Sequence, residues 1–97
     1  MANSLKESLT NLTLAFGKSV GSTEDIAEAD KEVMARLRSN ILGWEWIIYE
    51  AEIQGDDILF FGRVKGWESE VGYFTLENLE VSEAYITLDF AQNLYEQ

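Results

Sequence analysis

The spacing of apolar positions near the start of the chain predicts an amphipathic helix from Ser4 to Phe16. Its apolar stripe consists of Leu5, Leu9, Leu12 and Phe16, which recur at the spacing of one helix face. Ser4 and Glu7 form a capping-box sequence, and Gly17 suits the end of the helix. Such a stripe either packs on a sheet or binds a partner, and core packing is its commoner role. We therefore expect this helix to cover one face of a sheet.

The centre of the chain, from Trp44 to Glu80, predicts two β-hairpins in series. Gly55 and Asp56 fit the central pair of a tight turn, in which glycine supplies a positive φ. Four cross-strand pairs follow from this turn: Ile53 with Ile58, Ala51 with Phe60, Tyr49 with Gly62, and Ile47 with Val64. Because side chains alternate along a strand, these residues share one face. None of them is charged, so we expect this face to be the core.

The opposite face of the first hairpin combines apolar and charged side chains. It carries Trp44, Trp46, Ile48, Glu50 and Glu52 opposite Lys65, Arg63, Phe61 and Leu59. Trp46 is expected to face Lys65, and Arg63 to lie diagonal to Trp46 and Glu50, where cation–π and ion-pair contacts form.

The three tryptophans, Trp44, Trp46 and Trp67, support two interpretations. Aromatic side chains in such a sheet are commonly buried beneath a helix. Alternatively, the tryptophans form an exposed surface with Phe61, since an apolar patch rimmed by charge is typical of protein interfaces.

The second hairpin is predicted to turn through a loop at residues 66–69. This loop would pair Lys65 with Glu70, Val64 with Val71, and Phe61 with Phe74. Tyr73 would then lie across from Gly62 and cover the backbone that glycine leaves exposed. Thr75 is a suitable N-cap for a short helix that ends at Glu80.

Residues 21–38 also support two interpretations. Thr23 would cap a helix with acids in its first turns and arginines at its end, as the helix dipole favours. Alternation favours a strand that ends near Arg38, with apolar positions at Val33, Ala35 and Leu37. Residues 39–43 are expected to form a loop. A last strand is predicted from Ala84 to Phe90, after which the chain through Gln97 is expected to fray.

These elements predict a single α+β domain over residues 1–97. We expect the N-terminal amphipathic helix to pack on a small, twisted, mainly antiparallel sheet of four or five strands. The sheet would be a meander of two hairpins with a C-terminal strand added. A content of 46% apolar residues is typical of a folded domain. No apolar run approaches the ~20 residues of a membrane span and no signal peptide is apparent, so a cytoplasmic location is expected.

The chain is strongly acidic, with a formal net charge of −11 from 18 acids and 7 bases. Two blocks, residues 39–62 and 66–97, hold twelve acids and no base. Direct binding to a nucleic-acid backbone is not expected, because such binding needs lysine and arginine. The acidic surface either keeps the protein in solution or meets a basic partner.

The sequence shows no pattern that carries enzyme chemistry. It contains no histidine and no cysteine, which removes the commonest general base, thiol nucleophiles and most zinc sites. Three acidic pairs lie close together in sequence: Asp56 with Asp57, Glu50 with Glu52, and Glu68 with Glu70. The first is a hairpin tip with too few oxygens for calcium, the second lies near Arg63, and the third borders a loop. We therefore predict no catalytic residue, no metal site and no cofactor.

Several short motifs occur in a recognisable order. They are Asp30-Lys31, residues 33–37, Trp44-Glu45-Trp46, Phe60-Phe61-Gly62, Gly66-Trp67-Glu68, Gly72-Tyr73-Phe74-Thr75-Leu76 and Leu79-Glu80. This order resembles the small bacterial and mobile-element domains known as domain of unknown function 2958, from Asp30 to Glu80. The chain departs from the family in lacking proline and in its shorter, more acidic tail. The resemblance implies an α+β domain, favours the strand at the end of residues 21–38, and implies no activity.

Charge and aromatic content together predict a non-enzymatic interaction protein that docks on a basic partner. By analogy with the mobile-element family, one form is a nucleic-acid-mimicking inhibitor of a basic nucleic-acid-binding protein, of the counter-defence type that phages and plasmids encode. The residues expected to contact the partner are Glu68, Glu70, Glu77, Glu80, Glu83, Trp44, Trp46 and Trp67. The alternatives are an accessory module of a larger assembly and a carboxylate- or metal-dependent enzyme.

Overall fold

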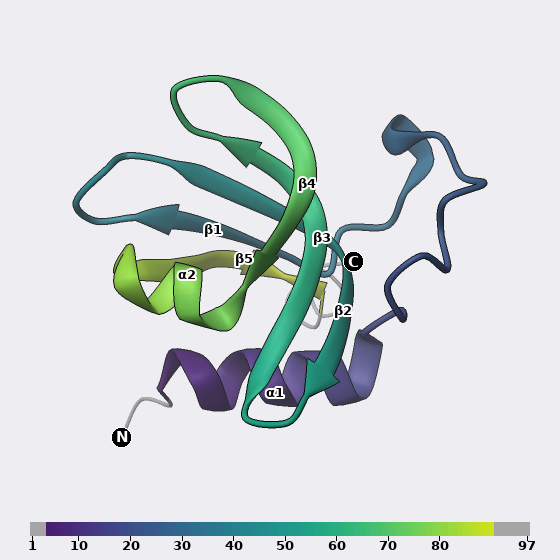
Figure 1. Ribbon diagram of the computed structural model, residues 1–97, viewed down its shortest axis with the longest axis horizontal. Coiled ribbons are helices and arrows are strands. Elements are labelled where there is room, and N and C mark those ends of the chain that lie inside the picture. The colour runs from purple at the N-terminus through teal and green to yellow at the C-terminus, as the bar shows by residue number, and fades with distance from the viewer. Residues whose placement is uncertain (1–3, 91–97) are drawn as a thin grey trace.

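Five antiparallel strands form one sheet in the computed structural model, which describes residues 4–90 (Figure 1). In chain order, the elements are α1 (Leu5–Phe16), a short 3-10 helix η1 (Glu28–Asp30), β1 (Ala35–Ser39), β2 (Glu45–Gln54), β3 (Asp57–Lys65), β4 (Ser69–Thr75), α2 (Leu76–Val81) and β5 (Ala84–Asp89). The strand order is β4-β3-β2-β1-β5, so β4 and β5 are the edge strands. This architecture confirms the predicted α+β fold.

The two helices pack on the same face of the sheet, which we call the inner face. Ser4 accepts a hydrogen bond from the backbone N–H of Glu7 at 3.1 Å and thereby caps α1, as predicted. Leu9 and Leu12 are buried in the core with Leu76 and Leu79 of α2. The apolar stripe of α1 therefore covers the sheet.

The first hairpin turns at Gly55 and Asp56 as predicted, but its register changes midway. The pairs Ile53–Ile58 and Ala51–Phe60 are present, and Gly55 has a φ of 62°. The predicted pairs Tyr49–Gly62 and Ile47–Val64 are wrong, because β2 carries an irregularity between Ile48 and Glu50. Beyond it, Ile48 pairs with Gly62, and Trp46 pairs with Val64. A bulge of this kind places one more residue on one strand than on its partner.

The bulge moves side chains to faces opposite to those predicted. Trp46 and Ile48 join the core on the inner face, whereas Tyr49 lies on the other side, which we call the outer face. Glu45, and not Trp46, pairs with Lys65. Glycine is needed opposite the bulge, because a Cβ at Gly62 would lie 1.9 Å from the carbonyl oxygen of Ile47.

The second hairpin has a shorter loop than predicted. Lys65 pairs with Ser69, so the loop contains residues 66–68, and every predicted pair is displaced by one residue. Tyr73 lies opposite Phe61, with ring centroids 5.2 Å apart, and Gly72 lies opposite Gly62. Tyr73 therefore does not cover Gly62. Thr75 caps α2 in a reciprocal capping box with Asn78, as predicted.

Residues 18–31 contain no α-helix and cross the outer face of the sheet; we call them the outer segment. The helix predicted from Thr23 is wrong, and the predicted strand near Arg38 is confirmed as β1. The backbone N–H groups of Gly21 and Thr23 donate to the Glu50 carboxylate at 2.6 and 3.1 Å. These bonds replace those that a helix would have made.

The C-terminal strand is confirmed as β5, which pairs with β1. The predicted fraying concerns residues outside the described range. Neither α1 nor α2 is long and apolar enough to cross a membrane, and this holds for residues 4–90.

Phe60 lies at the centre of the core, fully buried, with its ring centroid 5.5 Å from that of Phe74. We expect Phe60→Ala to lower the free energy of unfolding by about 3–5 kcal/mol, since it leaves a cavity. Leu14→Ala is the control, because Leu14 is 72% exposed on α1, and it should change stability by under ~0.5 kcal/mol. Chemical denaturation measures both, and a cost below ~1 kcal/mol for Phe60→Ala contradicts the assignment of the inner face.

Candidate partner-binding groove

The three tryptophans cluster at one end of the molecule but differ in exposure. Trp46 is 3% exposed, Trp44 is half-buried, and Trp67 is 88% exposed. The ring centroid of Trp44 lies 6.2 Å from that of Trp46 and 6.1 Å from that of Trp67, the latter in an edge-to-face arrangement. Such contacts hold Trp44 between a core residue and a surface residue.

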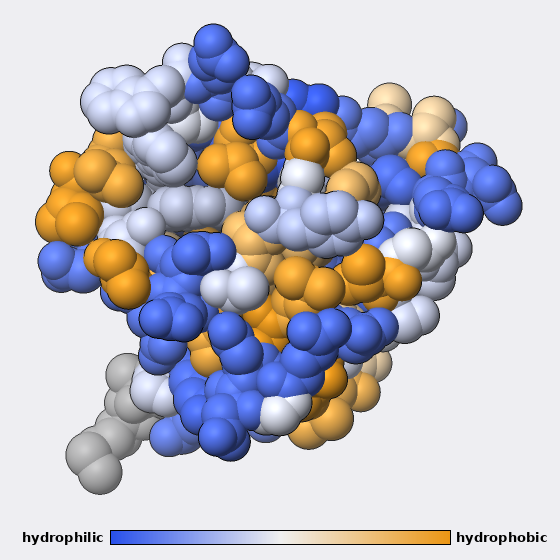
Figure 2. Space-filling model, viewed as in Figure 1, coloured by the Kyte–Doolittle hydropathy of each residue, from blue (hydrophilic) through white to orange (hydrophobic). Residues whose placement is uncertain are grey.

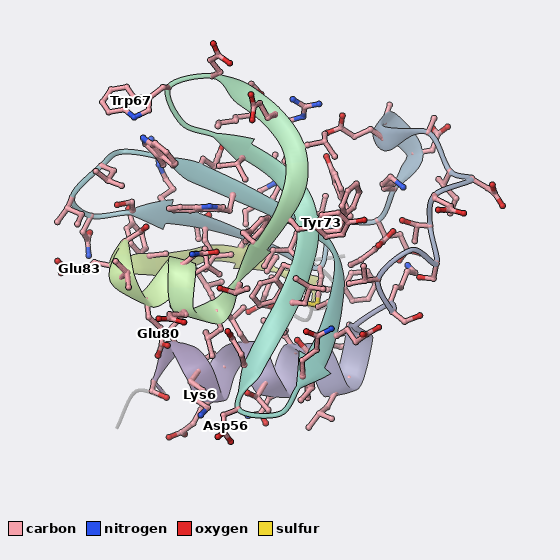
Figure 3. The ribbon with its side chains drawn as sticks, in the orientation of Figure 1. Lys6, Asp56, Trp67, Tyr73, Glu80 and Glu83 are labelled. Atoms are coloured by element: carbon pink, nitrogen blue, oxygen red, sulfur yellow. The ribbon has the colours of Figure 1, made fainter. Side chains whose placement is uncertain are left out.

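Of the two interpretations, burial is therefore confirmed for Trp46, and its predicted place among the partner-contact residues is wrong. The bulge in β2 turns its side chain to the inner face, where it packs in the core. Trp44 and Trp67 keep exposed surface, and Figure 3 shows Trp67 at the tip of the β3–β4 hairpin. Sequence alternation alone misplaced Trp46, since one extra residue reverses the face of every residue beyond it.

Two adjoining hollows form what we call the tryptophan groove. The first has a volume of about 300 Å³ and is lined by Trp44, Val64, Gly66, Trp67, Glu68 and Glu70. The second has a volume of about 400 Å³ and shares Trp44 and Val64 with the first. It continues over Trp46 and Phe74 toward Glu77 and Val81 of α2. The groove therefore runs along the inner side of the β3–β4 hairpin.

A glycine in the β3–β4 loop lets Trp44 form one wall of this groove. A Cβ at Gly66 would lie 2.7 Å from the Trp44 ring, so the indole packs directly on the backbone of the loop. Apolar side chains gather at the same end of the molecule, near the tip of the β1–β2 hairpin (Figure 2). Ile41 is 58% exposed there, and Val81 on α2 is 73% exposed.

Acidic side chains lie in and near the tryptophan groove. Glu68 and Glu70 line its first hollow and Glu77 its second, while Glu80 and Glu83 follow on α2 and the turn after it (Figure 3). We call these five residues the acidic rim. All five are exposed, and no ion pair involves any of them within residues 4–90. Their predicted role as contact residues stays a prediction, and the structure brings three of them to one groove.

Several of the bases lie in ion pairs elsewhere. Arg63 pairs with Glu28, Lys65 with Glu45 and Lys18 with Glu32, at 2.6, 3.5 and 3.2 Å. None of these three pairs involves a carboxylate of the acidic rim.

Glu28 is a residue of the outer face that sequence reasoning did not identify. Its carboxylate accepts two hydrogen bonds from Arg63, both at 2.6 Å, and one from the Tyr49 hydroxyl at 2.6 Å. The bonds from Arg63 and Tyr49 lower the pKa of Glu28 to about 2. Burial, followed by the bond to Glu28, raises the pKa of Tyr49 to about 12. No local signal marks this contact, since Glu28 and Arg63 lie far apart in sequence.

The predicted association of Arg63 with Glu50 and Trp46 is wrong. Glu50 is buried and accepts hydrogen bonds from the outer segment, while Glu52 accepts one from the N–H of Val20 at 3.3 Å. Burial raises the pKa of Glu50, but bonds from Thr23 and Gly21 outweigh it and hold the pKa below its usual range. These carboxylates therefore fasten the outer segment to the sheet.

Lys31 completes the attachment of the outer segment. Its ammonium donates to the carbonyl and hydroxyl oxygens of Thr23 and lies 6.0 Å from the centroid of the Phe61 ring. The Thr23 hydroxyl in turn donates to Glu50. Phe61 is therefore packed on the outer face and is not part of the tryptophan cluster.

Asp57, one of the two hairpin-tip acids, has structural contacts as well. Asp57 accepts hydrogen bonds from the backbone N–H groups of Ile58 at 2.8 Å and Glu77 at 3.4 Å. Within residues 4–90, no group of three or more Asp, Glu, His or Cys side chains is placed to hold a metal ion.

No family model matches the chain, and neither does any curated protein or solved structure. The resemblance to domain of unknown function 2958 therefore stays a prediction.

The low pKa of Glu28 predicts a pH dependence of stability. A carboxyl whose pKa is about 2 when folded, against an ordinary value of 4.5, stabilises the fold fully above pH 4.5 and loses that contribution as the pH falls toward 2. We expect Glu28→Gln to lower the denaturation midpoint at neutral pH. Between pH 4.5 and about 2, the midpoint of this variant should fall less than that of the wild-type protein. The control is Glu24→Gln, an exposed neighbour. Identical pH profiles for Glu28→Gln and wild type would contradict the assignment.

Divalent ions are expected to bind only weakly, because no set of ligands converges in the described chain. Isothermal titration calorimetry with Mg²⁺, Ca²⁺ and Zn²⁺ should show salt-sensitive association with the acidic surface. A saturable one-to-one site tighter than about 10 μM would contradict this and support a metal-dependent enzyme.

Proposed function

We propose that this protein is a non-enzymatic interaction protein whose tryptophan groove binds a basic segment of a nucleic-acid-binding protein. The observation that carries this proposal is the joining of Trp44 and Trp67 with Glu68 and Glu70 in one open hollow. No lysine or arginine lines either hollow of the groove. Aromatic rings and unpaired carboxylates together favour a cationic ligand.

The chemistry of the groove suits arginine in particular. A guanidinium stacks on aromatic faces and forms paired hydrogen bonds with a carboxylate, and it is more weakly hydrated than an ammonium group. An arginine side chain that stacks on the exposed ring of Trp67 would meet the carboxylates of Glu68 and Glu70 at the same time. Trp67 is available for such a contact because it is 88% exposed.

The net charge of −11 extends the attraction beyond the groove. A field of one sign raises the rate at which an oppositely charged partner arrives, and the effect weakens as salt rises. The acidic rim adds to this field locally, since its members have no ion-pair partners in the described chain.

Proteins that bind nucleic acid present the complementary surface. Their grooves hold lysine and arginine that neutralise phosphates, often beside aromatic side chains that stack on bases. An acidic protein with an exposed tryptophan offers both kinds of contact and would occupy the nucleic-acid site of such a protein in place of nucleic acid. We therefore propose inhibition by competition as its mode of action. The outer-face carboxylates favour binding over catalysis, because Glu28 and Glu50 already bond to protein groups.

Neutralising the acidic rim tests this proposal. The variant changes Glu68, Glu70, Glu77, Glu80 and Glu83 to Gln, and the probe is an arginine-rich peptide. We expect the association rate at low salt to fall by about tenfold and its salt dependence to flatten, with less effect on dissociation. Stability should be little changed, because all five side chains are exposed. Stopped-flow fluorescence of the tryptophans measures the rate.

The matched control changes an equal number of exposed acids away from the groove. They are Glu7, Glu24, Asp25, Asp30 and Asp56, on α1, the outer segment and the β2–β3 turn. This control carries the same net charge as the rim variant, so the two differ only in location. If both variants associate at the same rate, total charge accounts for binding and the groove has no special role.

A further inference from the structure

Strand β4 is an open edge of the sheet beside the tryptophan groove. Within residues 4–90, β4 pairs with β3 and with no other strand. Alternate residues of an edge strand direct their N–H and C=O groups away from the sheet, where another extended chain can pair with them. Ser69, Glu70, Val71 and Tyr73 of this edge strand are all exposed.

The usual devices that block an edge strand are scarce here. The pairing of β3 with β4 shows no bulge, and β4 contains neither proline nor lysine. Its glutamate, Glu70, repels acidic strands but attracts basic ones. Pairing with a second copy of this chain is disfavoured, because each copy carries a net charge of −11.

Gly72 gives an independent indication of what approaches this edge. A Cβ built on Gly72 would have no atom within 4 Å, so the missing side chain leaves open space. Gly72 shares the inner face with Glu70 and Phe74, by alternation along β4, and these two residues line the tryptophan groove. Glycine within a strand often marks close approach of a ligand or another backbone.

We propose that β4 binds an extended, arginine-bearing segment of the partner as an additional strand, with an arginine side chain in the tryptophan groove. This inference rests on the proposed function and specifies how the basic segment is held. Main-chain hydrogen bonds to the β4 edge supply affinity, and side-chain pockets supply selectivity. The segment lies beside Glu70 and Gly72, where its inward side chains reach the groove.

The two sides of β4 predict the sequence pattern of the bound segment. Inward side chains meet Glu70 and the groove, which favours arginine or lysine. Outward side chains meet Val71 and Tyr73, which are 39% and 65% exposed, and this favours apolar or β-branched residues. Figure 3 shows Tyr73 on the side of the hairpin that faces the outer segment. The ligand is therefore an alternating basic and apolar sequence.

Two peptides of equal composition test this mode of binding. One alternates arginine and valine, and the other groups the arginines before the valines, so that net charge is the same. We expect the alternating peptide to bind about tenfold more tightly in fluorescence titration. N-methylation of every second backbone amide can be made in two versions, on the odd-numbered or on the even-numbered residues. One version should abolish this advantage and the other should spare it, because only one set of amides faces β4.

The outcomes separate this inference from the proposed function. If neither peptide binds, the proposed function fails. If both peptides bind equally and neither N-methylated version binds more weakly, the proposed function is retained as attraction by charge, and binding by strand addition is overturned.

Gly72→Val provides a test within the protein. The site has room for the side chain and no positive φ, so the variant should keep the wild-type denaturation midpoint. Valine would fill the open space at this position on β4, beside the groove, and weaken binding of the alternating peptide by about tenfold. Gln54→Val, an exposed strand position at the end of β2, is the control and should bind as wild type. Wild-type affinity in a folded Gly72→Val protein overturns the proposal. If that variant does not fold, the N-methylated peptides provide the test of strand addition.

Discussion

The bulge between Ile48 and Glu50 is the constraint on which the rest of the structure depends. By adding one residue to β2, it sends Trp46 and Ile48 into the core and leaves Tyr49 and Glu50 on the outer face. Gly62 makes it sterically acceptable, because any larger residue would collide with the backbone of Ile47. This one bulge therefore makes the inner face of the hairpin apolar and places polar side chains on its outer face.

The difference between the two faces explains why one end of the molecule is suited to binding. On the outer face, Glu28 and Glu50 accept bonds from Arg63 and from the backbone of the outer segment. Acids and bases satisfy one another there. At the tryptophan groove, Trp46 provides a buried floor beneath Trp44, and no lysine or arginine of the described residues lines either hollow. Uncompensated charge and exposed aromatic surface therefore coincide.

Local sequence signals predicted the parts of the fold that local interactions form. The cap of α1 at Ser4, the turn at Gly55 and the N-cap at Thr75 each depend on residues within a few positions. The bulge and the contact of Glu50 with Gly21 depend on residues far apart in sequence, so periodicity could not reveal them. Charge blocks identified Glu68 and the other acids of the groove correctly as exposed, whereas alternation misplaced Trp46.

Mapping the site by NMR tests the central claim most directly. In a ¹H–¹⁵N correlation spectrum of the labelled protein, each tryptophan gives a separate indole N–H signal. On titration with an arginine-rich peptide, we predict that the indole signals of Trp44 and Trp67 and the amide signals of β4 shift together. The amide signals of Gly21 and Thr23 on the outer face should stay in place. Shifts spread evenly over all acidic surfaces, or centred on the outer segment, would contradict the account.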